Sequence, residues 1–410
     1  MVMAALAGCT SGMSDSGRHA PGVGCTTREV SRDTLVVEGG REFYVGVTTM
    51  AHSRGEVLIA GWPAYLSGRS DDGRPIRTPA DSILGVIFSS GRPATTIRTP
   101  SDAHTIGGVR ALARPDGAWD VVFADLSSTA PEGAAQRDTA SRLWYGVYDG
   151  RRWKSLEEIP TPGGFTIHPL KGTQLVRSGD VLSWAVRTTR PGYHPDVLVF
   201  HRKDGAWLSE TVGVPATAYI EMAHLGGAGP VLAAVHGDTS IRTGDTNSLF
   251  LYSRDSVWRG VGRVALGGAA PVHHPSLHTD SGAVLTWYVH TPAGNQVRVA
   301  RSPAETPSNE VSVLDSAYSG GRAVVSMRLA AGSVWVVNHR AAGRERAQLR
   351  FLRRAGRQAN EVARWESPFE SNIRGIPTGD SDMLLAGGSI RTRDSIPISL
   401  LVRVRLNCGK

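Results

Sequence analysis

Residues 196–207 read DVLVFHRKDGAW, and residues 208–212 continue as LSETV. Apolar side chains alternate on both sides of Asp204-Gly205, a dipeptide that favours the two-residue turn of a β-hairpin. Related segments with a turn before a tryptophan occur at residues 141–153, SRLWYGVYDGRRW, and at residues 247–258, NSLFLYSRDSVW. The chain therefore uses one hairpin design more than once.

The repeat extends over most of the sequence. One apolar position recurs at intervals of 48 to 60 residues: Ile83, Leu143, Leu198, Leu249, Val297, Leu349 and Leu400. A second position precedes it each time, at intervals of 49 to 64 residues: Val57, Val121, Val181, Val231, Val284, Val334 and Met383. Two interleaved columns with one period indicate a supersecondary unit that is used seven times.

Each unit reads as four antiparallel strands. The earlier column lies in compact apolar runs such as VVFA at residues 121–124, and the later column lies in the first arm of the hairpin. The second arm adds a strand, and a further strand precedes each run, as at residues 109–114, 219–224 and 323–328. Four-stranded units of about 50 residues predict an all-β fold, a seven-bladed β-propeller of four-stranded antiparallel blades. Six blades remain the alternative, if one weak unit is something else.

The two ends of the chain are expected to close the ring. The Arg-rich residues 340–357 could suggest a helix, but residues 348–352 fall in register with the other hairpin arms, so we predict a strand. The seventh unit ends at Cys408 without its fourth strand. We predict that residues 34–38, TLVVE, supply that strand, and that a ring therefore needs no capping repeats.

The length and net charge of the chain exclude few classes of function. The chain has 410 residues and a net charge of +8, from 45 Lys and Arg against 37 Asp and Glu. The basic residues are spread out, which fits weak attraction to anionic surfaces or glycans and does not indicate nucleic-acid binding. No run approaches the ~18 apolar residues of a membrane span.

Residues 6–9, LAGC, resemble the lipobox of bacterial lipoproteins. The resemblance implies cleavage before Cys9, lipidation of its thiol and attachment to a membrane by that lipid anchor only. Residues 10–24 are small and polar, as in a flexible tether. Residues 1–5, MVMAA, lack a positive n-region, so either the true start lies upstream or Cys9 is there by chance.

We therefore expect residues 1–24 to be a truncated lipoprotein signal and tether, and residues 25–410 to be a single propeller domain. The expected location is the bacterial cell envelope, as an exported periplasmic or surface lipoprotein. Cys25 and Cys408 lie near the two ends of the folded part, and an exported protein can oxidise them to a disulfide. The alternative is two unrelated thiols.

Ligand-binding candidates come from the loops. In propellers, the connections that enter the innermost strand share one face with those between the second and third strands, and this face commonly binds ligands. Here those connections carry aromatic, imidazole and charged side chains: His104, His168, Tyr219, Glu221, His273, His274, Tyr318, Phe369, Arg74 and Arg77. Such groups can bind a glycan or a peptide by stacking and hydrogen bonds. The alternative is a solvated rim with some packed aromatics.

Two other patterns of residues indicate structural roles and not ligand or metal binding. Basic or imidazole residues recur at the far ends of the innermost strands, among them His52, Arg114, Arg177 and Arg328, and are expected to be paired turn residues. Residues 273–278, HHPSLH, contain three histidines without the spacing of a zinc site, so no metal and no cofactor are predicted.

The hairpins at residues 203–207, KDGAW, and 253–258, SRDSVW, resemble the Asp-box turns of sialidase-like propellers. The pattern of that superfamily is Ser-x-Asp-x-Gly-x-x-Trp, whereas here Asp and Trp are three residues apart. The resemblance implies a related fold. Sialidases need an arginine clamp, a Tyr–Glu pair and an acid Asp, and the spacing of the residues here does not single out such a set.

Two functions remain. The first is an exported, membrane-anchored and monomeric binding protein for a glycan, peptide or envelope protein. The second is a glycan-active enzyme, a sialidase-like glycosidase or lyase. An enzyme should bring two carboxylates or a Tyr–Glu pair together in an accessible site, whereas a binding protein need not. Of the two, the sequence favours the binding protein.

Overall fold

The computed structural model describes residues 25–37, 41–69, 75–79, 83–89, 94–99, 106–126, 140–168, 172–190, 194–213, 217–225, 229–236, 248–254, 257–265, 273–279, 283–291, 294–301, 312–318, 323–330, 332–339, 347–355, 358–369, 373–389 and 398–408. All extended regular elements within these ranges are β-strands. The same ranges contain no helix that is long and apolar enough to cross a membrane.

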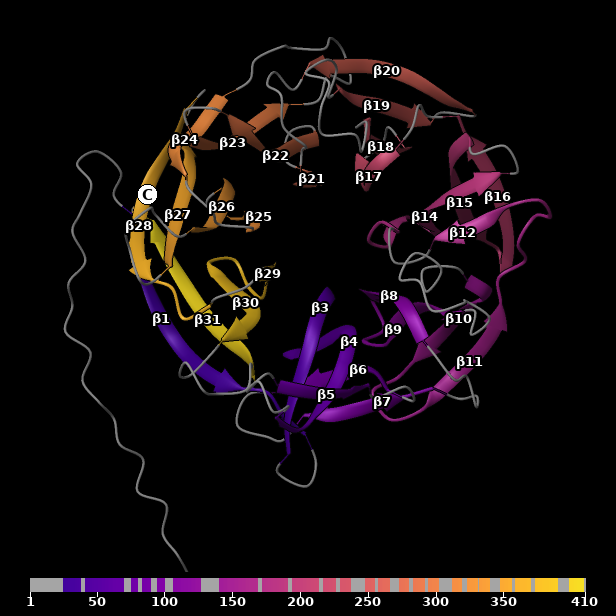
Figure 1. The fold of residues 1–410 in the computed structure, drawn as a ribbon, viewed down its shortest axis with the longest axis horizontal. Helices are drawn as coiled ribbons and strands as arrows, with labels where there is room; N and C mark the ends of the chain where they lie inside the picture. Colours follow the sequence, from indigo (N-terminus) through magenta and orange to yellow (C-terminus); the bar gives the residue numbers. More distant parts are fainter. Residues whose placement is uncertain are drawn as a thin grey trace, which may run out of the picture.

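The described strands form seven sheets, which stand in a ring around a common centre (Figure 1). We call each sheet a blade. Four blades follow one plan, in which four consecutive strands pair in chain order. Their strands are β8 (Ile106–Ala113), β9 (Trp119–Leu126), β10 (Ala140–Tyr148) and β11 (Trp153–Glu158); β17 (Thr217–Leu225), β18 (Gly229–His236), β19 (Ser248–Arg254) and β20 (Trp258–Ala265); β21 (His273–Thr279), β22 (Ala283–Thr291), β23 (Gly294–Arg301) and β24 (Ser312–Tyr318); and β25 (Ala323–Leu329), β26 (Gly332–His339), β27 (Gln348–Ala355) and β28 (Gln358–Glu366).

Two blades vary the plan. The first blade in the chain pairs β2 (Val36–Val37), β3 (Arg41–Ser53), β4 (Glu56–Arg69), β6 (Ile83–Phe88) and β7 (Thr95–Arg98), with β5 (Pro75–Pro79) beside β4. In the other, two short strands, β12 (Thr166–His168) and β13 (Val176–Ser178), both pair with β14 (Val181–Arg190), followed by β15 (His194–Lys203) and β16 (Ala206–Val212).

The last blade joins the two ends of the described chain. Its order is β1 (Cys25–Thr34), β31 (Ile398–Cys408), β30 (Asp382–Ser389) and β29 (Ile373–Pro377), so the earliest strand pairs with the latest one. The antiparallel register places Cys25 opposite Cys408. Figure 1 shows indigo β1 beside yellow β31 at the rim of the ring.

The prediction that an N-terminal strand completes the last blade is confirmed, but the residues expected to form that strand are wrong. Residues 34–38 were expected to supply the outer strand, but β1 ends at Thr34, and Val36–Val37 pair with β3 of the next blade. Leu35 is fully buried between these two strands, and its N–H donates to the Ser399 carbonyl at 2.9 Å. The apolar run therefore connects the closing blade to the first blade in the chain, and the polar residues before it, β1, form the edge strand of the closing blade.

The hairpin turn expected at Asp204-Gly205 is confirmed. Both residues have positive φ, 51° and 81°, and they connect β15 to β16. This conformation matches a type I′ turn, which carries the right-handed twist of the flanking strands. Glycine is needed at the second position because it adopts positive φ without steric cost.

The hydrophobic core lies between neighbouring blades. One cluster joins Val122 and Tyr145 of the β8–β11 blade to Trp184 and Phe200 of the next blade. Another joins Val336 and Phe351 to residues of the closing blade, and a third joins that blade to the first blade in the chain. In the closing blade, apolar side chains on both faces are therefore buried, which fits its continuous apolar strand.

Candidate functional site

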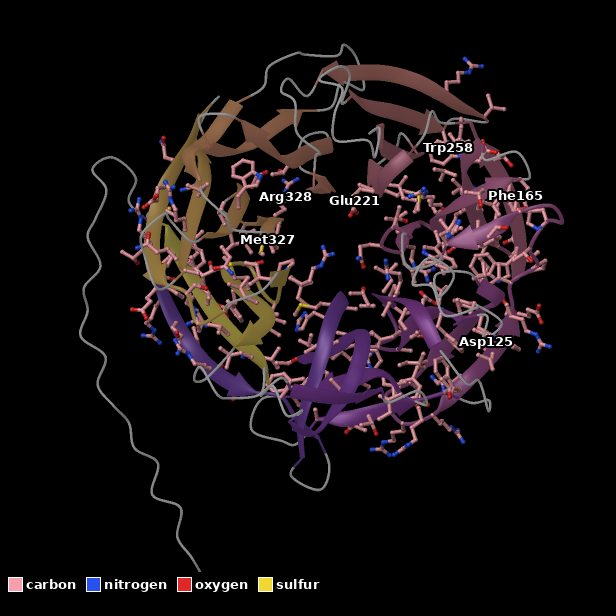
Figure 2. The ribbon with its side chains drawn as sticks, in the orientation of Figure 1. Asp125, Phe165, Glu221, Trp258, Met327 and Arg328 are labelled. Carbon is pink, nitrogen blue, oxygen red and sulfur yellow. The ribbon has the colours of Figure 1, made fainter. Side chains whose placement is uncertain are left out.

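Three charged side chains from three blades act on one another at the inner strands. Arg110 lies on β8, Glu221 on β17 and Arg374 on β29. Arg110 and Arg374 both favour the ionised form of Glu221 through their charges, and Arg374 disfavours the charged form of Arg110. Figure 2 shows Glu221 directed toward the centre of the ring. We refer to Arg110, Glu221 and Arg374 as the central charge cluster.

Arg110 is held in place by neutral acceptors. Its Nε donates to the Thr173 carbonyl at 3.0 Å, its Nη2 to the Gly172 carbonyl at 2.7 Å, and its Nη1 to the Val109 carbonyl at 2.9 Å. The residue is only 5% exposed. A guanidinium that is fixed in this way loses little further freedom when it binds a ligand group.

The acceptors exist because the inner strand of the neighbouring blade is interrupted. His168 of β12 pairs with Arg187, and Val176 of β13 pairs with Ser183, so seven residues of the chain separate the two pairings on this side and only three, 184–186, separate them on β14. Thr173 remains hydrogen-bonded to Ala185 of its own blade. Its N–H donates to the Ala185 carbonyl at 2.8 Å, and the Ala185 N–H donates to its hydroxyl at 3.2 Å. The extra length turns two carbonyls toward β8.

The same segment also reaches a third blade. The hydroxyl of Thr49 on β3 donates to Oε1 of Gln174 at 2.7 Å, and it also accepts from the Ala111 N–H of β8 at 3.4 Å. Thr49 is 1% exposed, and its contact with Gln174 is partly buried. Residues 172–174 thus connect the inner strands of three successive blades around Arg110.

Burial and charge set the proton affinities of the cluster. Burial raises the pKa of Glu221 to about 7, although the charges of Arg374 and Arg110 pull it down. Burial, together with repulsion from Arg374, lowers the pKa of Arg110 to about 10. A carboxyl group with a pKa near neutrality can hold or release a proton at physiological pH.

The cluster offers positive charge and one titrating carboxyl group. With Glu221 ionised, the three side chains sum to one positive charge, and with Glu221 protonated they sum to two. Within the part of the chain that the structure describes, no group of three His, Cys, Asp or Glu side chains could hold a metal ion. The chemistry available at the cluster is recognition of an anion and transfer of a proton.

Among the sequence candidates, Glu221 is the one that the structure places in this cluster. His168 ends β12, where its Nε2 lies 3.3 Å from the Thr189 hydroxyl of its own blade. Phe369 is fully buried in the core between two blades, and its carbonyl accepts from the Ser367 hydroxyl at 3.1 Å. A side chain so enclosed presents no surface to a ligand.

The other candidates are placed in part or not at all. His104, Arg74 and Cys9 lie outside the described residues. For five more the structure describes the strand but not the side chain: Arg77 on β5, Tyr219 on β17, His273 and His274 on β21, and Tyr318 at the end of β24. Tyr219 lies two residues before Glu221 on the same strand.

Two of the basic residues at the far ends of the inner strands are paired, as expected. Arg114 Nη1 donates to Oδ1 of Asp120 at 3.0 Å, and Arg177 Nη2 donates to Oδ2 of the same carboxylate. Asp120 is fully buried and also accepts from the Tyr145 hydroxyl at 2.7 Å. This Tyr–Asp contact is the kind of pair that an enzyme could use, but Tyr145 is 1% exposed and no substrate reaches it.

A Ser–His–Glu series is also enclosed. The Ser183 hydroxyl lies 2.8 Å from His201 Nδ1, and His201 Nε2 lies 3.6 Å from Oε2 of Glu210. Ser183 and His201 are 3% and 4% exposed, and Glu210 is engaged by Arg254 at 2.5 and 2.8 Å. Because the hydroxyl has no access to a substrate, the series is structural, and Glu210 links it to Arg254 of the next blade.

Sequence reasoning missed Arg110, Thr49 and Gln174. The available signal was an arginine inside an apolar inner strand, IGGVRALA. A buried arginine requires partners, so its position predicts a built polar site. The sequence could not predict which carbonyls accept hydrogen bonds from Arg110, because their positions depend on how the adjacent blade folds.

Comparisons with known proteins identify the fold only. No protein family model and no curated protein matches the chain. Among solved structures, it is similar to a puromycin-hydrolyzing peptidase of Mycobacterium tuberculosis, with a TM-score of 0.55 and 15% identity over 92% of this chain and 55% of that chain. It is also similar to a puromycin hydrolase, with a TM-score of 0.53 and 12% identity over 90% of this chain and 52% of that chain.

The Hadza microbial sialidase Hz136 is a more distant likeness, with a TM-score of 0.47 and 7% identity over 80% of this chain and 72% of that chain. The chain spans about half the length of the two puromycin-cleaving proteins. At these identities the matches to those two proteins show a β-propeller fold, and neither substrate nor reaction follows from them.

Proposed function

We propose that this chain is a binding protein: a closed, seven-bladed propeller that takes a glycan, peptide or protein ligand at the centre of its ring. The observation that supports this is the central charge cluster, contributed by three blades and braced by residues 172–174. Binding sites are commonly built in this way, with a few polar groups fixed on a rigid scaffold.

The proposal includes the expected location. Lipid attachment at Cys9 would hold the propeller at the bacterial envelope as a monomer, with residues 10–24 as the tether. Mass spectrometry of the protein purified from its native membrane fraction tests this directly. A lipid-modified N-terminal peptide at Cys9 supports the anchor, and an unmodified Cys9 removes it.

The proposal also includes a disulfide between Cys25 and Cys408. It is supported by their opposite positions in the β1–β31 register. Directly opposed residues of antiparallel strands are about 4.5–5.5 Å apart at Cα, within the range that disulfides span.

The alternative function is a glycan-active enzyme, and one observation favours it. Glu221 has a pKa of about 7, which suits a general acid or base. It lacks a second carboxylate or a tyrosine among the groups that the structure places with it, and the enclosed Tyr145–Asp120 pair does not supply one.

One pair of assays separates the two functions. The purified full chain is applied to a glycan and peptide array, and it is incubated in parallel with chromogenic glycosides. We expect retention of one ligand class, lost in Glu221→Ala, with no product from the glycosides. Turnover that disappears in Glu221→Gln would support the enzyme and overturn the binding proposal.

A further inference from the structure

One of the two opposed cysteines is in contact with a guanidinium group of a neighbouring blade. Nη1 of Arg353 on β27 donates to Sγ of Cys25 on β1 at 3.2 Å. Arg353 belongs to the β25–β28 blade and Cys25 to the closing blade, so this hydrogen bond crosses the boundary between the two blades. A positive charge therefore lies against the sulfur at the point where the first and last described strands meet.

The surroundings of Cys25 make this contact chemically significant. Cys25 is 3% exposed and belongs to the core cluster between the two blades, with Val362 on one side and Leu406 on the other. Apolar surroundings disfavour a thiolate, whereas a guanidinium in contact stabilises it through a charge-assisted hydrogen bond. A disulfide sulfur or a neutral thiol is only a weak acceptor. The contact therefore favours the thiolate over the other states of this sulfur.

We propose that Arg353 makes the Cys25–Cys408 link redox-adjustable, because it holds Cys25 as a thiolate when the link is reduced. This rests on the proposed function, which includes that disulfide. A disulfide whose reduced form is stabilised has a higher reduction potential and is reduced more readily. The seal of the ring then responds to the thiol reductants around it instead of being a permanent crosslink.

Reduction takes place in two thiol exchanges. A thiolate of the reductant attacks Sγ of Cys408, since Cys25 is enclosed, and the electron pair of the broken Cys25–Cys408 bond leaves with Cys25. A second thiolate of the reductant then attacks the reductant sulfur bonded to Cys408 and releases Cys408, which takes up a proton. The protein gains two electrons, and two reductant thiols become one disulfide. Of the two protons that these thiols lose, one goes to Cys408 and the other to solvent.

The effect of reduction is confined to the seam. The backbone pairs between β1 and β31 continue from Thr26 and Asn407 to Thr34 and Leu400, and they do not depend on the sulfur atoms. The reduced ring therefore keeps this ladder and loses only its covalent link. The state of the link sets how firmly β1 is held as the edge strand of the closing blade.

The test measures the equilibrium between the linked and reduced full chain in mixtures of reduced and oxidised dithiothreitol. Samples are quenched with acid and alkylated, and the linked fraction is measured by mass spectrometry. Arg353→Gln should lower the equilibrium constant for reduction about tenfold, which corresponds to about 30 mV in the reduction potential. Arg405→Gln is the matched control and should leave the constant unchanged, because Arg405 lies on β31 of the same blade and pairs with Asp382.

The sign of the change separates this role from a structural one. If Arg353 only packed two blades together, its loss would loosen the seam and make the link easier to reduce. The proposal requires the opposite change, a link that is harder to reduce. A constant that is unchanged or raised in Arg353→Gln overturns the inference.

A second measurement follows the thiolate itself. The reduced full chain is titrated with base, and the ultraviolet absorbance of thiolates is recorded in the wild type, Arg353→Gln and Arg405→Gln. One thiolate should form at a lower pH in the wild type and in Arg405→Gln than in Arg353→Gln, and three coincident titrations would overturn the inference.

The two proposals can fail separately. If peptide mapping finds no linked species, the disulfide of the proposed function and this inference fail together. If the linked species exists but its reduction does not depend on Arg353, the disulfide stands and only the inference fails.

Discussion

At the scale of single residues, Glu221 shows how burial and charge compete. Its two arginine neighbours favour the carboxylate, yet burial outweighs them and raises the pKa to about 7. The folded protein therefore holds a proton on Glu221 over a pH range in which the unfolded chain, with an ordinary glutamate pKa of about 4.3, has released it.

This difference predicts a pH dependence of stability. Below the unfolded pKa, Glu221 is protonated in both states and costs nothing. As the pH rises toward 7 the cost of ionising it in the fold appears, and above 7 the cost is complete. Glu221→Gln should therefore gain melting temperature relative to the wild type at about pH 8 and gain none at about pH 4. Thermal melts across this range check it, and a constant difference at every pH would refute it.

Tyr145 provides a second residue-scale prediction. Its hydroxyl donates to the fully buried Asp120 carboxylate at 2.7 Å. Tyr145→Phe should lower the free energy of unfolding by about 1.5–3 kcal/mol, the usual worth of a hydrogen bond to a charged group. Denaturant titration measures the loss.

The matched control is Tyr148→Phe, on the same strand. Tyr148 is also buried, at 4% exposed, and its hydroxyl makes no hydrogen bond to another residue that the structure describes. It should cost much less. Equal losses in the two variants would mean that the Asp120 contact is not the cause.

The site could be predicted only in part from the sequence, for physical reasons. Glu221 was named as part of a connection that enters an inner strand, whereas the structure places it within the strand itself, β17. Arg110 was not named, because its position depends on the carbonyls of Gly172 and Thr173, which belong to the neighbouring blade. Contacts between blades are set by three-dimensional packing, which the period of the repeat does not encode.

At the scale of elements, adjacent blades are joined by a repeated contact at the rim. Glu157 of β11 accepts from Arg202 Nε and from Trp207 Nε1 of the next blade, each at 2.8 Å. Glu210 of β16 accepts from Arg254 of the blade after it. The tryptophan after each turn, which the sequence singled out, thus belongs to the junction between blades.

Close strand packing predicts a sharp cost at Gly85 on β6. A Cβ built there would lie 2.4 Å from the Ile59 carbonyl oxygen and 2.8 Å from Cα of Ala60, and neither backbone atom can move aside easily. Gly85→Ala should lower the free energy of unfolding by about 1–3 kcal/mol or more, the usual cost of overpacking. The measurement is denaturant unfolding of the purified variant.

Gly213→Ala is the matched control, because a Cβ at Gly213 meets no atom within 4 Å. It should be neutral or slightly stabilising, since alanine reduces the freedom of the unfolded chain. If both variants lose the same stability, the close approach of β6 to β4 is wrong.

The strands themselves were largely predictable. Each column of apolar residues falls within the expected strand, and residues 348–352 lie in β27 and not in a helix. The N-terminal strand was displaced because an apolar run is a stronger signal than the polar, alternating CTTREVSRDT that forms the exposed edge. Edge strands pair through backbone groups, so their side chains leave a weaker pattern.

At the scale of the whole molecule, closure decides stability. The β1–β31 pairing joins residues that are 383 positions apart at Cys25 and Cys408, so it removes much of the freedom of the unfolded chain if the cysteines are bonded. The chain-entropy model gives about 5–6 kcal/mol as an upper bound for such a loop.

Cys408→Ser should therefore lower the melting temperature under oxidising conditions. In the presence of a strong thiol reductant, the variant and the wild type should melt together, because both then lack the crosslink. Scanning calorimetry in both buffers makes the comparison. A variant that melts with the wild type in both buffers would show that no disulfide stabilises the ring.

The most direct measurement of ring closure is peptide mapping of the unreduced protein by mass spectrometry. A ring that is sealed by its first and last described strands predicts one linked species, which joins the peptide containing Cys25 to the peptide containing Cys408 and separates on reduction. If both cysteines of the unreduced, unfolded chain instead react fully with an alkylating reagent, the proposed seal of the ring is contradicted.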